Sequence, residues 1–174
     1  MSTLEQTRET ATGAAEGAPI TIEEASAFIW REAEMLDRQE YADWLKLWTE
    51  QGIYVIPIDR EEGDYASELN IAYDDAAMRE MRVKRLKSGF AMSSAPSART
   101  VRTTSRFVID GTDGDATVVR CAQMLVEFKF ERTRVVGADM IYRLVRRDGG
   151  LALDGKVVRL LNSDDPLWGI GYLF

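Results

Sequence analysis

The sequence contains no histidine and only one cysteine, Cys121, among its 174 residues. A Rieske iron–sulfur cluster takes two Cys and two His ligands, and a mononuclear oxygenase iron takes two His and a carboxylate. This chain can supply neither set, and the same absence excludes Ser-His-Asp triads and Cys–His pairs. Any redox chemistry near this protein must therefore be done by another chain. We expect the lone cysteine to be inert.

Long hydrophobic runs and an excess of positive charge are also missing. No stretch approaches the roughly 20 apolar residues of a membrane span, and the N-terminus lacks the pattern of a signal peptide. Asp and Glu total 29 against 22 Lys and Arg, and the net charge of −7 has the wrong sign for a nonspecific phosphate binder. We therefore expect a soluble, cytoplasmic protein with no nucleic-acid or membrane partner.

What the chain does have is enough apolar residues, 45%, to bury the core of one domain. Residues 1–19 are rich in Thr, Ala, Glu and Gly and have little to bury, so we expect a disordered tail there. Residues 20–174 are expected to form a single domain.

The first half of the domain predicts three helices. The first spans residues 21–37, opens with a capping box of Thr21 and Glu24, and carries apolar residues at helical spacing. A second, short helix is predicted over residues 41–48, with Gly52 as its terminator. The third begins at Asp74 or Asp75 and runs to about residue 87, and its basic residues are interpreted as a solvated or acid-paired face, with a subunit contact as the alternative. We expect the first three tryptophans to lie in the core: Trp30, Trp44 and Trp48.

The second half predicts a sheet. Residues 53–58 form a short β-rich run that Pro57 interrupts, which is typical of an edge strand or its exit. From Arg99 onward four long β-branched segments follow, with hairpin signals at Asp113-Gly114 and Asp148-Gly149. This order predicts an α+β fold in which N-terminal helices pack on a strongly curved, mainly antiparallel sheet.

Four segments together resemble the β (small) subunit of aromatic-ring-hydroxylating dioxygenases, which have the NTF2-like cone fold. They are residues 28–57, with a helix ending in Leu36-Asp37, residues 71–89 with Tyr73-Asp74-Asp75 and spaced arginines, residues 96–106 (PSARTVRTTSR), and the closing residues 156–174. The sequence departs from the pattern at Ala98, which separates Ser97 from Arg99. The resemblance runs from about Ile22 to Phe174.

The resemblance implies a non-catalytic structural subunit in aromatic compound catabolism. In such enzymes the Rieske cluster and the mononuclear iron belong to the large α subunit, so no cofactor is expected in this chain. The implied partners are that α subunit and further copies of this chain, in an assembly of three α and three β subunits.

A different class of function remains open: a free-standing NTF2-like lyase or isomerase, or a small-ligand-binding protein, with its pocket in the cone. Asp37 and Tyr41 would carry the chemistry in the enzyme, together with Tyr54 or Tyr73, because burial can raise the pKa of a carboxyl group for proton transfer. The alternative is that Asp37 ends or caps a helix and that the tyrosines fill the core.

Two groups of residues are candidates for a subunit interface. Arg99 and Arg102, with further arginines on the strands, could pair with acidic groups of another subunit, or they could form cross-strand ion pairs with Glu127 and Asp139. The chain also finishes on aromatic residues that something must cover. They pack either against another subunit or back into the cone mouth of the same one: Trp168, Tyr172 and Phe174.

Overall fold

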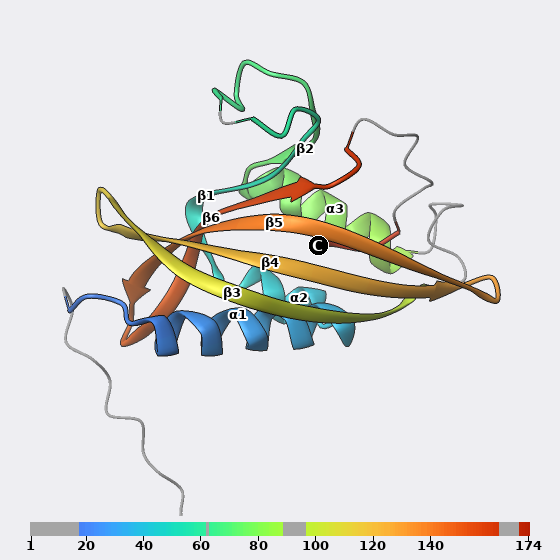
Figure 1. Cartoon of the computed structure of the whole chain (residues 1–174), viewed down its shortest axis with the longest axis horizontal. Coiled ribbons are helices and arrows are strands. Elements are labelled where there is room, and N and C mark those ends of the chain that lie inside the picture. The colour runs from blue at the N-terminus through green and yellow to red at the C-terminus, as the bar shows by residue number, and fades with distance from the viewer. Residues whose placement is uncertain (1–17, 62, 89–96, 164–170) are drawn as a thin grey trace, which may run out of the picture.

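The fold is a six-stranded mixed sheet with three helices, seen in a computed structural model that describes residues 18–61, 63–88, 97–163 and 171–174 (Figure 1). The helices are α1 (Ile22–Asp37), α2 (Tyr41–Leu45) and α3 (Ala76–Ser88). The strands are β1 (Trp48–Pro57), β2 (Asn70–Asp74), β3 (Arg99–Asp113), β4 (Ala116–Lys129), β5 (Arg132–Arg147) and β6 (Gly150–Leu160). Their order in the sheet is β2-β1-β6-β5-β4-β3, with β1 and β6 parallel and the other neighbours antiparallel.

Helix α1 begins as its capping box predicts. The Thr21 side chain accepts a hydrogen bond from the backbone N–H of Glu24, and the Glu24 side chain accepts one from Thr21. Its buried positions include Ala25, Ile29 and Leu36, which lie on the face turned toward the sheet. Just before the helix, the backbone oxygens of Ala18 and Pro19 accept hydrogen bonds from the Arg146 guanidinium.

The predicted meander from β3 to β6 is confirmed. Each of these strands pairs with the next in antiparallel register. Asp148 and Gly149 both have positive φ, as the two central residues of a tight I′-type hairpin require. The paired strands are long, and in Figure 1 they arch above α1 and α2.

The predicted second helix is wrong beyond Leu45. Trp48 opens strand β1 instead, because Leu47 and the residues that follow can pair with β6, beginning with the hydrogen bond from Leu153 N–H to Leu47 O. Gly52 lies inside this strand and terminates no helix. A Cβ there would stand 2.9 Å from the Leu153 oxygen, so glycine is needed for close strand packing.

Strand β1 is also not an edge strand. It lies between β6 and β2, and β2 forms the edge of the sheet in a stretch with no predicted strand. Pro57 is nevertheless the last residue of β1, next to an irregularity in the register with β2, as predicted for a strand exit.

Helix α3 is correct in position, with Asp75 as its cap, because the Asp75 carboxylate accepts the N–H of Met78 at 2.8 Å. Its buried face carries Val83 and Arg79, whereas Met81 is 51% exposed. The Arg79 guanidinium donates to the backbone oxygens of Gly52 and Thr49 and lies over the Trp48 ring. Only part of the basic run is therefore a solvated or acid-paired face.

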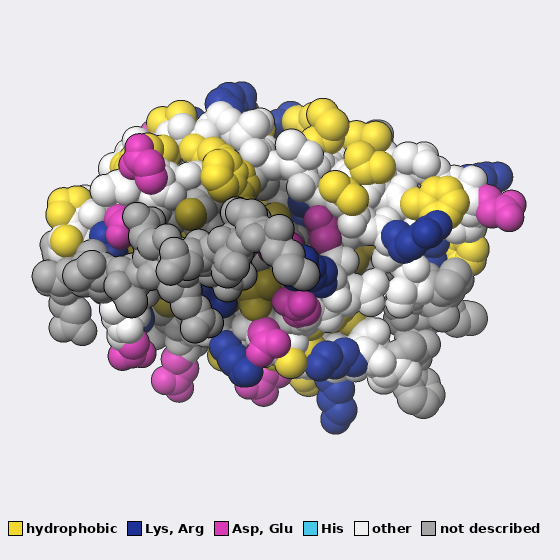
Figure 2. Space-filling view, turned by 90° about the horizontal axis from the view of Figure 1, so that it is seen from below, with side chains coloured by type: hydrophobic (Ala, Val, Ile, Leu, Met, Phe, Trp, Pro, Cys, Tyr) yellow, Lys and Arg dark blue, Asp and Glu magenta, His cyan; other side chains and the backbone are white. Residues whose placement is uncertain are grey.

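Two faces of the sheet result from the alternation of side chains along β3 to β6. The inner face, toward α1 and α2, carries the core, including Leu125, Met140 and Val158. Trp44 is fully buried there and Trp48 packs against it, but Trp30 points outward and is 55% exposed, so its predicted core position is wrong. The outer face carries exposed apolar residues, and in Figure 2 hydrophobic side chains gather along the upper edge of the view.

Candidate functional site: a filled cone interior beneath an exposed sheet face

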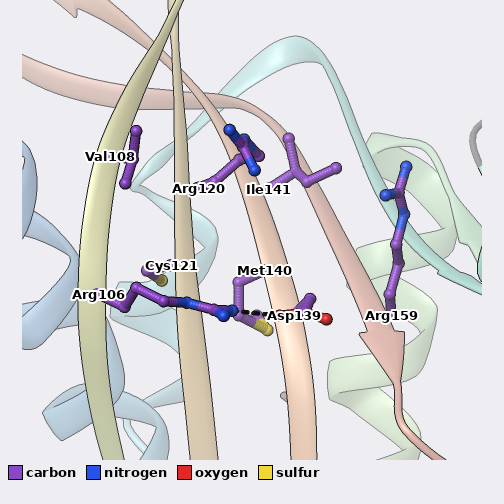
Figure 3. Close-up of a pocket in the computed structure, with 8 residues that line it drawn as sticks. All are labelled: Arg106, Val108, Arg120, Cys121, Asp139, Met140, Ile141 and Arg159. Atoms are coloured by element: carbon purple, nitrogen blue, oxygen red, sulfur yellow. Dashed lines mark hydrogen bonds and ion pairs between the residues drawn. The ribbon is translucent and has the colours of Figure 1, made fainter.

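Several of the strand arginines form ion pairs with acidic residues of the same chain. The predicted pairing with Asp139 is confirmed for Arg106, and Arg60 binds the same carboxylate at 3.2 Å. Figure 3 shows Arg106, Arg120 and Arg159 along the outer face with the helices behind the sheet. Glu127 pairs with Arg134, which was not among the candidates.

The two interface candidates of strand β3 lie on opposite faces. Arg99 is exposed and stacks on the Phe128 ring, with its guanidinium carbon 4.8 Å from the ring centroid. Arg102 points inward, is 8% exposed, and forms an ion pair with Asp37. Only Arg99 therefore presents its charge at the surface of the single chain.

A row of apolar side chains crosses the outer face of three strands. Val101 of β3 stands directly opposite Val126 of β4, which stands opposite Val135 of β5. These three residues are 64%, 37% and 58% exposed, and Met124 and Phe128 flank Val126 along β4 with similar exposure. Because the described helices pack elsewhere, this outer row remains open to a partner.

The cone interior, the space between the inner sheet face and helices α1 and α2, contains a buried ionic cluster. Lys156 Nζ donates to Glu32 Oε1 at 2.6 Å, and these residues are 0% and 1% exposed. The same carboxylate accepts from Trp44 Nε1 at 2.9 Å and from the Tyr142 hydroxyl at 3.2 Å. Glu32 thus has a donor on each oxygen, as a buried carboxylate requires.

Burial sets the protonation chemistry of this cluster. Desolvation lowers the pKa of Lys156, and the neighbouring Glu32 carboxylate opposes that shift. Desolvation, with Glu32 nearby, raises the pKa of Tyr142 well above its ordinary value. Near neutral pH, Tyr142 therefore keeps its proton and serves as a donor to Glu32.

Sequence reasoning missed Glu32 and Lys156 as a pair. A signal for each was present: Glu32 falls on the helix face of Ala25, Ile29 and Leu36, and Lys156 shares the strand face of Val158. A charged residue at a core position of an amphipathic element points to a buried partner. Nothing local indicates which partner, because the two residues are 124 positions apart.

The last residues of the chain fill the rest of the interior. Tyr172, Leu173 and Phe174 are 7%, 2% and 0% exposed, and the Tyr172 and Phe174 rings meet edge to face with centroids 5.4 Å apart. Phe174 donates its N–H to the Tyr54 hydroxyl at 3.1 Å, and its backbone oxygen accepts from Lys156 Nζ at 2.7 Å. The structure therefore packs Tyr172 and Phe174 back into their own chain; Trp168 lies outside the described residues.

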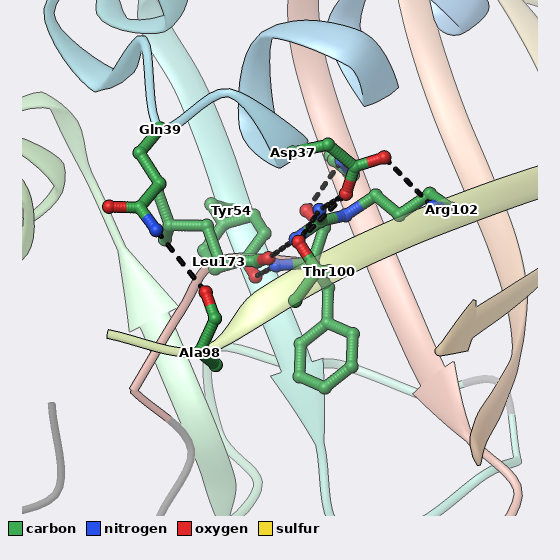
Figure 4. A network of polar contacts seen from close by, with 9 residues as sticks. Asp37, Gln39, Tyr54, Ala98, Thr100, Arg102 and Leu173 are labelled. Carbon is green, nitrogen blue, oxygen red and sulfur yellow. Dashed lines mark hydrogen bonds and ion pairs between the residues drawn. The ribbon is translucent and has the colours of Figure 1, made fainter. Parts of the chain in front are cut away.

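Asp37 connects the end of α1 to strand β3 and to this closing segment (Figure 4). Its carboxylate accepts hydrogen bonds from the Thr100 hydroxyl and the Arg102 backbone N–H, each at 2.8 Å, and from the Arg102 guanidinium. Arg102 also donates to the backbone oxygen of Leu173. Asp37 is thus occupied by donors of its own chain.

The tyrosines considered with Asp37 do not gather in one open pocket. Tyr41 is 5% exposed, and desolvation raises its pKa. Tyr54 is 1% exposed beneath Phe174, while Tyr73 is 41% exposed on the edge strand. Asp37 is the last residue of its helix, and two of the three tyrosines fill the core.

The chain does not fit either iron centre that a ring-hydroxylating oxygenase uses. The sequence has no histidine, and among the residues that the structure describes no three Cys, Asp or Glu residues form a metal-binding group. None of the described helices is long and apolar enough to cross a membrane. Cys121 is buried, and desolvation raises the pKa of its thiol to about 12, so the thiol keeps its proton near neutral pH.

A comparison with solved structures supports the predicted fold. The structure matches a crystal structure of the β subunit of benzoate 1,2-dioxygenase from Burkholderia mallei with a TM-score of 0.71, over 88% of this chain and 99% of that one, at 20% identity. This match confirms the predicted α+β cone with a mixed sheet.

The family follows from the sequence. Residues 31–164 match the model of the ring hydroxylating beta subunit family, so the chain belongs to that family. It is 28% identical over 119 residues to the β subunit of benzoate 1,2-dioxygenase from Acinetobacter baylyi, covering 66% of this chain and 70% of that one. It is 29% identical over 139 residues to the small oxygenase component of the p-cumate 2,3-dioxygenase system of Pseudomonas putida, covering 79% and 77%. The predicted resemblance is confirmed, and these relatives are subunits of dioxygenases.

Proposed function

We propose that this chain assembles and orients the larger, iron-bearing α subunits of a ring-hydroxylating dioxygenase and does no chemistry itself. Three copies would form a base for three α subunits, so that the Rieske cluster of one α subunit faces the mononuclear iron of the next. Closed cyclic assemblies of this kind are common among soluble oligomers. The α subunits would supply both iron centres, because this chain lacks the histidines to do so.

The observation that carries the proposal is the contrast between a filled interior and an open outer face. The cone interior, where a free-standing enzyme of this fold would bind its substrate, holds residues 172–174 of the same chain. The apolar row of Val101, Val126 and Val135 instead faces outward. Exposed apolar surface on a sheet favours contact with another chain.

The test is co-purification. Tagged protein expressed in its native cells should bring down a larger chain with iron and acid-labile sulfide, and native mass spectrometry should give equal numbers of the two chains. A metal-free oligomer of this chain alone would overturn the scaffold function and favour the cone-pocket enzyme.

Substitutions can assign the contact to the apolar row. Val126→Lys combined with Val135→Lys should abolish recovery of the larger chain or break up the trimer, because both lysines would need desolvation in a contact. Leu69→Lys is a matched control, since Leu69 is 81% exposed and precedes the edge strand β2. If both variants lost recovery of the larger chain equally, the apolar row would not be the contact surface.

A further inference from the structure

The closing residues are held in the cone interior through backbone atoms, in the way that a bound peptide is held. Arg102 donates to Leu173 O, Tyr54 accepts from Phe174 N–H, and Lys156 donates to Phe174 O. The Phe174 ring is fully buried in the hydrophobic core that the helices and the inner sheet face form. These contacts recognise an aryl group and, a few bonds away, an oxygen acceptor.

The buried charges of the interior are not explained by stability alone. Replacing a buried ion pair by apolar residues of similar size is often neutral or stabilising, so Glu32 and Lys156 are a costly way to fill a core. Their arrangement does have a geometric result. Glu32 holds one N–H of Lys156 at 2.6 Å, and the ammonium directs a second N–H to the oxygen of Phe174 at 2.7 Å. The pair fixes a cationic donor at the point where a ligand's oxygen would lie.

We propose that the cone interior is a binding site for an aromatic acid or amide, and that residues 172–174 occupy this site in cis. An aryl ring takes the place of Phe174, and Lys156 binds the carboxylate or amide oxygen. Arg102 and Tyr54 bind further polar groups along the ligand. The site does not depend on the scaffold function, because none of its residues lies on the outer sheet face.

The test separates the segment from the rest of the chain. A variant that lacks residues 172–174 is titrated with N-acetyl-Tyr-Leu-Phe and followed by calorimetry and thermal unfolding. The Tm of the truncated chain should rise with peptide concentration and saturate, because the ligand binds the folded state. The full chain should show no binding, since its site is already filled.

Two controls define the contacts. N-acetyl-Ser-Leu-Ala, which lacks both rings, should not bind the truncated chain. Tyr54→Phe in the truncated chain removes one neutral hydrogen bond and should weaken binding of the aromatic peptide by about 2- to 12-fold.

The outcome is decisive even where truncation unfolds the chain. Recovery of cooperative unfolding when the aromatic peptide is added, and not with the control peptide, supports the site. The proposal is wrong if the truncated chain remains unfolded in saturating peptide, or if it folds and binds neither peptide or both equally. Co-purification with a larger chain is a separate measurement, so the two proposals can fail independently.

Discussion

On the inner face of the sheet, Lys156 of β6 and Tyr142 of β5 direct their polar groups at Glu32, and the end of the chain closes over them. On the outer face of the same sheet, Val126 lies between Val101 and Val135 with no described helix over it. The inner face holds a buried polar cluster within its apolar core, and that cluster is complete within one chain, whereas the outer face has an apolar row that is open. The expected arrangement of a single-chain domain, with an apolar interior and a polar surface, is thus partly reversed.

This difference separates what holds the chain together from what joins it to others. Groups whose hydrogen-bond partners lie within the chain contribute to its own folding. Their removal should lower the unfolding free energy of the isolated chain. Exposed groups on the outer face contribute little to folding. Their substitution should weaken only the binding of another chain. Substitutions on the two faces should therefore have different effects on stability and on assembly.

The largest effect is expected from Lys156→Met. Loss of the ammonium leaves the Glu32 carboxylate buried without its counter-charge, which costs about 3–5 kcal/mol of unfolding free energy. Urea unfolding of the isolated chain measures it. Glu32→Leu added to Lys156→Met should restore part of the loss, because the unpaired carboxylate is removed although Trp44 Nε1 and the Tyr142 hydroxyl lose their acceptor. A single variant that loses under about 1 kcal/mol would refute the buried pair.

A smaller effect is expected at alkaline pH from Cys121, which faces the same interior. Burial raises the pKa of its thiol from 9.0 to about 12, so the folded chain keeps a proton that the unfolded chain loses. This contribution to stability is fully present below pH 9 and is lost as the pH rises toward 12, by up to about 1.4 kcal/mol per pH unit. Urea midpoints measured at half-unit steps from pH 8 to 11 should show the decline.

Cys121→Ala is the matched control for that decline. Burial also raises the pKa of Tyr172 to about 12, and a tyrosine of the unfolded chain is half ionised near pH 10, so tyrosines add to the decline in both proteins. Only the thiol differs between them, and the stability of the variant should therefore fall less steeply with pH than that of the parent chain. Desolvation also lowers the pKa of Lys156, but that contribution is common to both proteins. Parallel pH profiles would mean that the thiol is accessible to water.

Much of this fold could be predicted because its signals are local. The capping box of Thr21 and Glu24 and the Asp148-Gly149 turn each depend on neighbours in sequence, and the structure confirms both. The turn between β4 and β5 gave no such signal. Phe130 and Glu131 both have positive φ there, although neither is a residue that favours it, so the long pairing of the two strands imposes the turn.

What could not be predicted depends on long-range contacts. Trp48 fits a helical spacing with Tyr41 and Trp44, and only its pairing with β6 makes it a strand residue. The site is similar. Glu32 and Lys156 become a pair only when α1 packs against the inner face of the sheet, and Arg79 is buried because the backbone oxygens of Gly52 and Thr49 accept its N–H groups. Periodicity reports which side of an element is apolar, but it does not report what that side meets.

The smallest effect on stability is expected at Val126, and its neighbour Leu125 provides the comparison. The two residues are adjacent on β4 but face opposite ways, with Leu125 0% exposed and Val126 37% exposed. Leu125→Ala should cost about 2–5 kcal/mol through lost burial and a cavity. Val126→Lys should change the unfolding free energy of the isolated chain by less than about 1 kcal/mol, the range of strand propensity on a solvated face.

The same Val126→Lys variant should nevertheless fail to bind the larger chain. Unchanged stability together with lost assembly is expected if the outer row serves only to contact a partner. Urea unfolding of the isolated chain and co-purification of the larger chain are therefore measured on one preparation. A cost above about 2 kcal/mol would mean that the outer row already supports the single chain, and its exposure would then give no reason to expect a partner there. Normal assembly with normal stability would move the contact to another surface, because a lysine in a buried apolar contact must lose its hydration.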